Sequence, residues 1–286
     1  MKEKYPSRKY FEGGLIISKD SVQTSLDNAL YLCVIEKSEY NPDYIKIFTC
    51  LAGIGFEKMV LVLYDSQKWD MKSVMFFDSE SVTLPVPEIT LYYFSAKEKK
   101  FIVPTTNIEN IMDFFESVKV RLRNIHEIKD DTFKWLQDNL SQFSESQLLK
   151  IYMNRLFLDG FIGFGKKKGK PSDIDMIVKN SEGKFSLIEI KEKDLPKKNK
   201  KGFGLDIPRL HDMIRISKQT GLDYFLIVRE VNNQTDRELI GYKYISIKDF
   251  EEDIQESTAV TGGTGMRSES TTNDTLICSY DLFRNL

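Results

Sequence analysis

Two short stretches of the sequence decide the fold of this chain: Pro171-Ser-Asp-Ile-Asp175-Met-Ile-Val178 and Phe185-Ser-Leu-Ile-Glu189-Ile-Lys191. Each is rich in apolar residues, as strands are, and an Asn-Ser-Glu-Gly turn ending at Gly183 lies between them. We therefore expect a hairpin that folds Asp175 back toward Glu189. Residues two apart on a strand project from the same face, so Glu189 and Lys191 should project together.

The residue types at this hairpin predict metal-assisted phosphoryl chemistry. Two converging carboxylates make an all-oxygen site that suits Mg²⁺, with Mn²⁺ as a substitute. The ion would polarise a phosphoryl oxygen and lower the pKa of a bound water. Lys191 would orient or activate that water, or offset charge on the scissile phosphate.

Helices and strands alternate around the hairpin, which indicates an α/β sandwich. The helix expected over 144–158 opens with a capping-box pattern, Ser144 followed by Gln147. The helix expected over 205–220 ends at Gly221. The remaining elements expected in this half are a helix over 131–140, strands over 175–178, 185–191, 224–228 and 242–247, a loop over 251–275 and an apolar return over 275–283.

The N-terminal half has a different pattern, typical of a sheet. Its short runs are rich in Val, Ile, Tyr and Phe and predict strands over 31–35, 44–50, 58–64, 73–77 and 89–94. Helical spacing of apolar residues predicts a helix over 107–123. The charged stretch 121–131 suggests a boundary, which gives a β-rich region over 1–125 and an α/β domain over 126–286. The first region would serve recognition, sensing or dimerisation.

The Asp-turn-Glu-x-Lys pattern resembles the PD-(D/E)xK nuclease superfamily, which includes type II restriction endonucleases and RecB-like nucleases. The resemblance covers residues 143–228. It implies a restriction-endonuclease-like mixed sheet flanked by helices, with Asp175 and Glu189 as metal ligands and Lys191 as the catalytic lysine. Asp175 directly precedes the apolar strand, as the metal-binding acid does in similar sequences, and Asp173 is the alternative.

The same resemblance points to residues on the neighbouring helices. Many such nucleases carry a Glu near a Ser-Glu helix start, and Ser144-Glu145 matches that placement, so Glu145 is a third candidate metal ligand. A first-turn acid favoured by the helix dipole explains Glu145 equally well. The helix after the lysine strand often presents a polar residue to the site, which here would be Arg209, as a phosphate contact, or His211.

Lysines cluster on both sides of the hairpin. Residues 161–204 hold 12 Lys and 6 Asp or Glu, a local charge of +6 in a chain whose net charge is −2. Lysines next to a phosphoryl-transfer site suit the neutralisation of a nucleic-acid backbone. The candidate contacts are Lys166, Lys167, Lys168, Lys170, Lys197, Lys198, Lys200 and Lys201.

Composition narrows the alternatives. With three cysteines, two histidines and no Cys-x-x-Cys pair, a His/Cys zinc site and a disulfide framework are both disfavoured. The sequence shows neither a signal peptide nor a membrane span, so we expect a cytoplasmic protein without a membrane or disulfide-linked partner.

Together these features predict a Mg²⁺-dependent endonuclease that hydrolyses DNA phosphodiester bonds, as a restriction-like, defence or repair enzyme, and as a homodimer if it cuts both strands. Three alternatives stay open: a nuclease for RNA or branched DNA, a ligand-gated effector nuclease, and a nucleic-acid-binding protein of nuclease-like fold that does not cleave.

Overall fold

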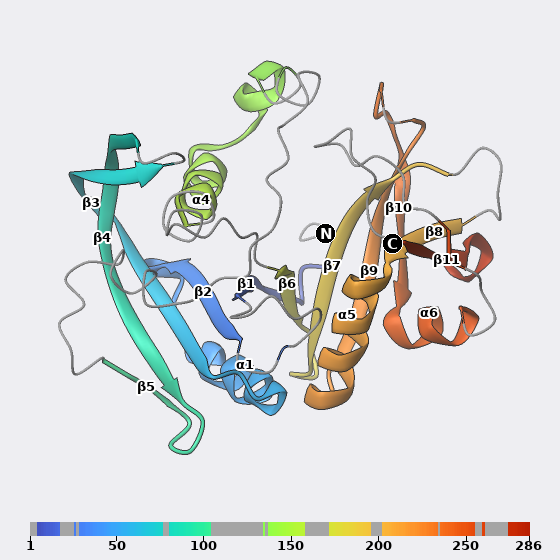
Figure 1. The fold of residues 1–286 in the computed structure, drawn as a ribbon, viewed down its shortest axis with the longest axis horizontal. Helices are drawn as coiled ribbons and strands as arrows, with labels where there is room; N and C mark the ends of the chain where they lie inside the picture. Colours follow the sequence, from blue (N-terminus) through green and yellow to red (C-terminus); the bar gives the residue numbers. More distant parts are fainter. Residues whose placement is uncertain are drawn as a thin grey trace. The chain divides into compact units, whose positions relative to one another are not determined.

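The computed structural model describes residues 5–17, 26, 29–76, 80–103, 134, 137–157, 172–195, 202–233, 235–254, 259–260 and 274–286. The protein is of mixed α/β class, as expected, with a large ten-stranded mixed sheet and a small two-stranded sheet (Figure 1). The described residues form two compact units. Unit 1 holds the residues up to Gly13 and from Ile174 onward, and unit 2 holds those from Gly14 to Asp173. The expected division near residue 125 stays a prediction.

Unit 1 is built on the predicted hairpin and the elements that follow it: β6 (Ser172–Lys179), β7 (Phe185–Lys193), β8 (Gly202–Asp206), α5 (Ile207–Thr220), β9 (Asp223–Val231), β10 (Leu239–Ser246), α6 (Ile247–Asp253), β11 (Thr275–Ser279), a 3₁₀ turn (Tyr280–Leu282) and β12 (Arg284–Asn285). β6 and β7 are antiparallel, and β7 continues through β8 and α5 into the parallel strand β9. β9 pairs antiparallel with β10, which pairs with β12, and β8 pairs with β11 in the small sheet.

The turn between β6 and β7 forms as its sequence predicts. Gly183 has φ +85°, a conformation that glycine adopts without the steric cost of a side chain. The side-chain oxygen of Asn180 accepts the backbone N–H groups of Glu182 and Lys184 at 3.0 and 2.9 Å. Similarly, Gly221 ends α5 with φ 66°. The turn predicted at Gly183 and the helix end predicted at Gly221 are therefore both confirmed.

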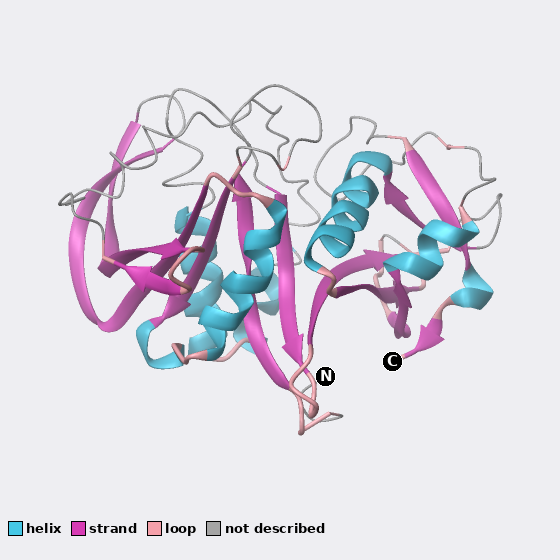
Figure 2. Ribbon diagram, turned by 90° about the horizontal axis from the view of Figure 1, so that it is seen from below, coloured by secondary structure: helices cyan, strands magenta, loops and turns pink. Residues whose placement is uncertain are grey.

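The two faces of the hairpin strands carry different sets of buried residues. On one face Val178, Ile188 and Ile227 form an apolar cluster. On the other face lie the buried residues Leu187, Tyr224, Leu226 and Val228, and α5 packs along β9 with its own buried residues, Leu210, Met213 and Ile216 (Figure 2). Glu189 and Lys191 belong to this second face, because they alternate with Ile188 and Ile190.

Two segments of unit 1 differ from expectation in their type of secondary structure. The segment 202–206 is strand rather than the start of a helix, because it pairs with β11, and α5 begins at Ile207. β10 ends at Ser246, whose hydroxyl accepts the N–H of Asp249 at 3.0 Å and begins α6. Residues 247–253 are therefore helical, where the sequence predicted a strand end and a loop. The predicted return of the chain near 275–283 is confirmed as β11 and the turn after it.

Unit 2 contains the described elements between the first strand, β1 (Lys9–Ile17), and the hairpin: β2 (Leu30–Glu36), α1 (Asp43–Leu51), β3 (Lys58–Phe76), β4 (Glu80–Ser95), β5 (Lys100–Ile102), α4 (Glu145–Arg155) and 3₁₀ turns at Lys37–Glu39, Ala52–Ile54 and Leu140–Gln142. β2 and β3 are parallel and joined through α1, and β3, β4 and β5 are successive antiparallel neighbours. The capping box of α4 is confirmed, and the C-terminal part of this helix packs in the core of unit 2.

The predicted strand over 44–50 is wrong, because this segment is the helix α1. Its buried residues Tyr44, Ile47, Phe48 and Leu51 follow helical spacing, although three of them are types that favour strands. The carbonyl of Asn41 accepts the N–H of Tyr44, and its side chain accepts the N–H of Asp43, which starts the first turn. The strands expected over 58–64 and 73–77 are parts of one strand, β3, and the break between them is a register shift against β4 between Asp65 and Trp69.

One strand near the start of the chain was not predicted. β1 (Lys9–Ile17) buries Phe11, Ile16 and Ile17, and its apolar pattern is interrupted by Gly13 and Gly14. At Gly13 a Cβ atom would lie 1.7 Å from the carbonyl oxygen of Ile174, so only glycine lets the backbones come this close. This contact abuts Asp175.

Several predicted features lie outside the described residues: the helix over 107–123, most of the helix over 131–140, and the flanking lysine clusters. Among the described helices, none has the length and apolar character that crossing a membrane requires.

Candidate active site

Asp175 on β6 and Glu189 on β7 each lie one residue beyond the paired part of the hairpin, whose last Cα partners are Met176 and Ile188. Because strand residues alternate between faces, both project from the face that carries the paired residues Ile177 and Leu187. Oδ2 of Asp175 accepts the backbone N–H of Ile190 at 2.6 Å, which fixes this carboxylate beside the Glu189 position.

The Glu189 carboxylate is fully buried and is held by two cations. Nε of Arg209 donates to Oε1 at 3.1 Å, and Nη2 of the same guanidinium donates to Oε2. The Lys191 ammonium lies 2.6 Å from Oε1. The Glu189 side chain has 0% of its surface exposed. A buried carboxylate requires such compensation, since burial of an unpaired charge costs several kcal/mol or more.

These contacts set the charge states of the site. Burial alone would raise the pKa of Glu189, but the charges of Arg209 and Lys191 together outweigh burial and hold that pKa below its ordinary value. Burial likewise favours a lower pKa for Lys191, and the carboxylates of Glu189 and Asp175 outweigh it, so the pKa of Lys191 is raised. Lys191 is therefore an ammonium at neutral pH, suited to hold negative charge rather than to remove a proton.

The two cations differ in their access to solvent. The Arg209 side chain is 13% exposed, whereas the Lys191 side chain is 38% exposed. Arg209 lies on α5. Its Nη2 is also 3.5 Å from the hydroxyl of Tyr224, which lies on β9. Lys191 is therefore the more accessible of these two cations to a ligand approaching the site.

A second lysine, Lys193, ends β7 on the same face. It is half-buried, and burial is the largest cause of its lowered pKa, with partial compensation by the charges of Asp206 and Asp194 and a further lowering by that of Lys191. No described residue forms a hydrogen bond or ion pair with its ammonium.

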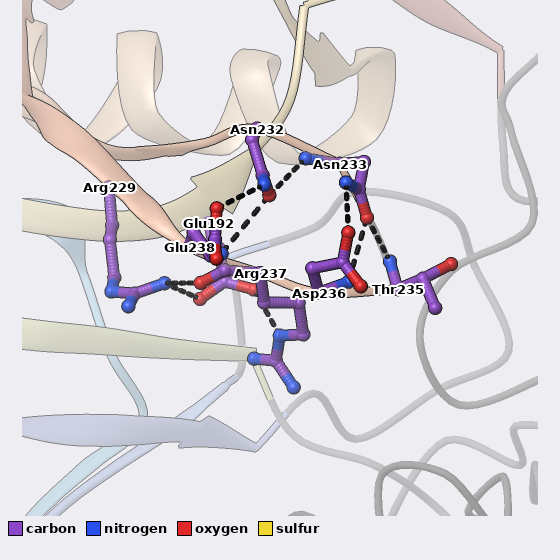
Figure 3. A network of polar contacts seen from close by, with 8 residues as sticks. All are labelled: Glu192, Arg229, Asn232, Asn233, Thr235, Asp236, Arg237 and Glu238. Atoms are coloured by element: carbon purple, nitrogen blue, oxygen red, sulfur yellow. Dashed lines mark hydrogen bonds and ion pairs between the residues drawn. The ribbon is translucent and has the colours of Figure 1, made fainter.

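The opposite face of β7 carries a third acid, Glu192, whose contacts are structural. Its carboxylate oxygens accept hydrogen bonds from Nη1 of Arg229 at 2.5 Å and from Nε of Arg237 at 2.6 Å (Figure 3). Asn233 closes the neighbouring β9–β10 turn by accepting the N–H groups of Thr235 and Asp236. Glu192 thus anchors this turn to β7 and does not belong to the Asp175 and Glu189 face.

The other predicted site residues are placed as follows. Asp173 is half-buried on β6, two residues before Asp175. Glu145 is the exposed first residue of α4 and belongs to unit 2, and its role as a metal ligand stays a prediction. His211 is exposed on α5. Arg209, predicted as a phosphate contact, is instead found on Glu189, and its contact with phosphate stays a prediction. The predicted nucleic-acid contacts outside the described residues are Lys166, Lys167, Lys168, Lys170, Lys197, Lys198, Lys200 and Lys201.

Sequence reasoning missed three residues that shape the site. Lys193 extends the Glu-x-Lys pattern by one more period of two, a signal that was present in the sequence. Tyr224 and Gly13 gave no such signal, because their proximity to the site depends on strand pairing over long sequence separations.

The donor set fits a hard divalent cation. Mg²⁺ is usually held by one or two carboxylates with waters and substrate phosphates rather than by an all-protein cage, and Asp175 and Glu189 are two such carboxylates. Among the described residues no group of three or more His, Cys, Asp or Glu could hold a metal ion. Because both oxygens of Glu189 contact cations, a metal ion would compete with Arg209 and Lys191 for this carboxylate.

Comparison of the chain with protein-family models, with curated proteins and with solved structures finds no match.

Proposed function

We propose that this protein is a Mg²⁺-dependent endonuclease that hydrolyses DNA phosphodiester bonds through a restriction-endonuclease-like core in unit 1. One observation carries the proposal. The carboxylate of Asp175 accepts the backbone N–H of Ile190, the residue after a fully buried Glu189, and the Lys191 ammonium lies 2.6 Å from Glu189 on the same strand face. The connection from β7 through α5 into the parallel strand β9 supports the likeness to PD-(D/E)xK nucleases.

Each residue has a role that follows from its contacts. Asp175 and Glu189 supply the oxygens that would hold Mg²⁺, which when bound polarises a phosphoryl oxygen and activates a water. Lys191, protonated and partly exposed, donates to a phosphate oxygen and offsets the charge that develops in the transition state. The backbone N–H of Ile190 keeps Asp175 oriented toward the site.

One observation favours an alternative function. Arg209 and Lys191 already neutralise Glu189, so the site is stable without a metal ion. A protein that binds nucleic acid on this face without cleaving it would need no more than this arrangement.

A cleavage assay separates the two functions. Purified full-length protein is incubated with supercoiled plasmid, linear duplex, single-stranded DNA and RNA, in Mg²⁺, in Mn²⁺ and in EDTA. The nuclease proposal requires metal-dependent strand breaks in DNA that EDTA abolishes. Binding of the same DNA with no breaks in either metal would support the non-cleaving alternative, and breaks in RNA alone would reassign the substrate.

A further inference from the structure

Lys193 continues the charged row of β7 beyond the residues that the proposed chemistry uses. The pairing of β7 with β9 runs without a register shift from Ser186 to Lys193, so no bulge interrupts the alternation of faces. Glu189, Lys191 and Lys193 therefore project from one face. Two residues of strand separate the two lysines by about 6.6 Å.

Within the part of the chain that the structure describes, no hydrogen bond or ion pair of the Lys193 ammonium explains its burial. Its partner position on β9 is Glu230, which is also buried, but the oxygens of Glu230 are engaged by the hydroxyl of Tyr280 at 3.0 and 3.2 Å. Asp206 and Asp194 act on Lys193 only through their charge, without an ion pair. A half-buried cation without a hydrogen-bond acceptor is costly, and that cost falls when an anion binds.

We propose that Lys193 forms a second phosphate subsite, which binds the backbone phosphate next to the one that Lys191 contacts. This inference rests on the proposed nuclease function. The strand presents two ammonium groups in a row along one edge of the site, and a nucleic-acid backbone presents its phosphates in a row. Lys191 acts on the reacting phosphate, and Lys193 fixes the register of the strand across the site, so Lys193 contributes to binding rather than to the chemical step.

The alternative for Lys193 is a structural one, in which its charge only balances Asp206. In that role, Lys193 would contact no individual phosphate of a bound strand. Its replacement would then affect the free protein and the DNA-bound protein to the same extent.

The test uses full-length protein, a duplex that the wild type cuts, and three variants: Lys193→Ala, Lys193→Arg and the matched control Lys248→Ala, an exposed lysine on α6 that removes the same charge. Binding is measured in EDTA as a function of salt, and single-turnover cleavage is measured in Mg²⁺ at saturating protein. A second set of duplexes carries one neutral methylphosphonate at each phosphate flanking the scissile one.

We expect Lys193→Ala to bind about ten-fold or more weakly, with a salt slope lower by about 0.9, and to cleave within three-fold of the wild-type rate once saturated. Lys193→Arg should restore most of the binding. At one position, the methylphosphonate should weaken DNA binding by the wild type. The same methylphosphonate should not weaken DNA binding by Lys193→Ala relative to the unmodified duplex. If Lys193→Ala matches Lys248→Ala, or if every methylphosphonate costs both proteins equally, the phosphate subsite is refuted while the nuclease function stands. Absence of cleavage by the wild type would overturn both.

Discussion

Replacing Arg209 with Gln removes one of the two cations that hold the buried carboxylate of Glu189. Loss of one partner from a buried ion pair typically costs 3–5 kcal/mol, and because Lys191 stays in place we expect the lower end, about 3 kcal/mol. For a chain of this size that corresponds to a fall in melting temperature of roughly 6–12 °C. Arg215→Gln on the same helix is the matched control and should have a small effect, because Arg215 donates to Gln219 across one turn.

The same substitution should change how the site binds metal. Arg209 and a divalent cation compete for the oxygens of Glu189, so Arg209→Gln should bind Mn²⁺ more tightly than the wild type in calorimetric titrations. The variant should then regain more stability from added Mn²⁺ than the wild type does, since a ligand stabilises in proportion to RT ln(1 + [L]/Kd). Thermal unfolding with and without Mn²⁺ measures both effects.

Two results would refute this reasoning. If Arg209→Gln has the same melting temperature as Arg215→Gln, the ion pair of Arg209 with Glu189 contributes nothing to stability. Other groups must then compensate the buried charge of Glu189. If Mn²⁺ affinity is unchanged or lower in Arg209→Gln, then Arg209 does not compete with metal for Glu189.

Further substitutions test the remaining parts of the site. Asp175→Asn should abolish cleavage in single-turnover assays while DNA binding survives, and Asp173→Asn should be mild; the reverse pattern would transfer the metal-ligand role to Asp173. Folding lowers the pKa of Glu189, so the ionised carboxylate stabilises the folded protein above the ordinary pKa range of Glu, and this stabilisation is lost as pH falls through the lowered pKa. The free energy of unfolding of Glu189→Gln should therefore depend less on pH in the acid range than that of the wild type. Gly13→Ala should lower the free energy of unfolding by about 1–3 kcal/mol, measured in urea, because its Cβ would strike the backbone beside Asp175. Replacing Lys197, Lys198, Lys200 and Lys201 with Ala should weaken DNA binding at all sequences alike and flatten its salt dependence by about 0.9 per lost phosphate contact. An unchanged salt slope would mean that these lysines do not contact phosphates.

The hairpin and its charges were predictable because their determinants are local. A glycine-containing turn, a period of two and the Glu-x-Lys pair all lie within 20 residues, and the structure keeps each of them. The capping box of Ser144 and Gln147 is equally local, and both of its hydrogen bonds are present. Features of this kind are specified by neighbouring residues and depend little on the rest of the chain.

The helix α1 and the strand β1 were not predictable in the same way. Tyr44, Ile47 and Phe48 have strand-favouring side chains, and their helical spacing prevailed over propensity. β1 has its apolar residues interrupted by Gly13 and Gly14, which weaken the strand signal in its sequence, and it pairs with β2. Residue spacing therefore decides the case of α1, and pairing with a distant strand decides that of β1.

The partner of Glu189 also depended on long-range structure. The sequence placed Arg209 on a helix after the lysine strand, but only the packing of α5 on β9 brings its guanidinium to a carboxylate 20 residues earlier. The consequence is that two cations already hold the carboxylate that we propose as a metal ligand, and this arrangement has no signature in the sequence.

The central claim, that the acids and lysine of this hairpin cleave phosphodiester bonds, is tested most directly at Lys191. The measurement is the single-turnover rate of plasmid cleavage in Mg²⁺ for the wild type, Lys191→Ala and the control Lys248→Ala. We predict that Lys191→Ala loses a factor of about a hundred or more, the scale of a lost electrostatic group in a transition state, while it still binds Mn²⁺ and DNA. Cleavage by Lys191→Ala at the wild-type rate would mean that the Glu189 and Lys191 pair is structural, and it would contradict the nuclease assignment.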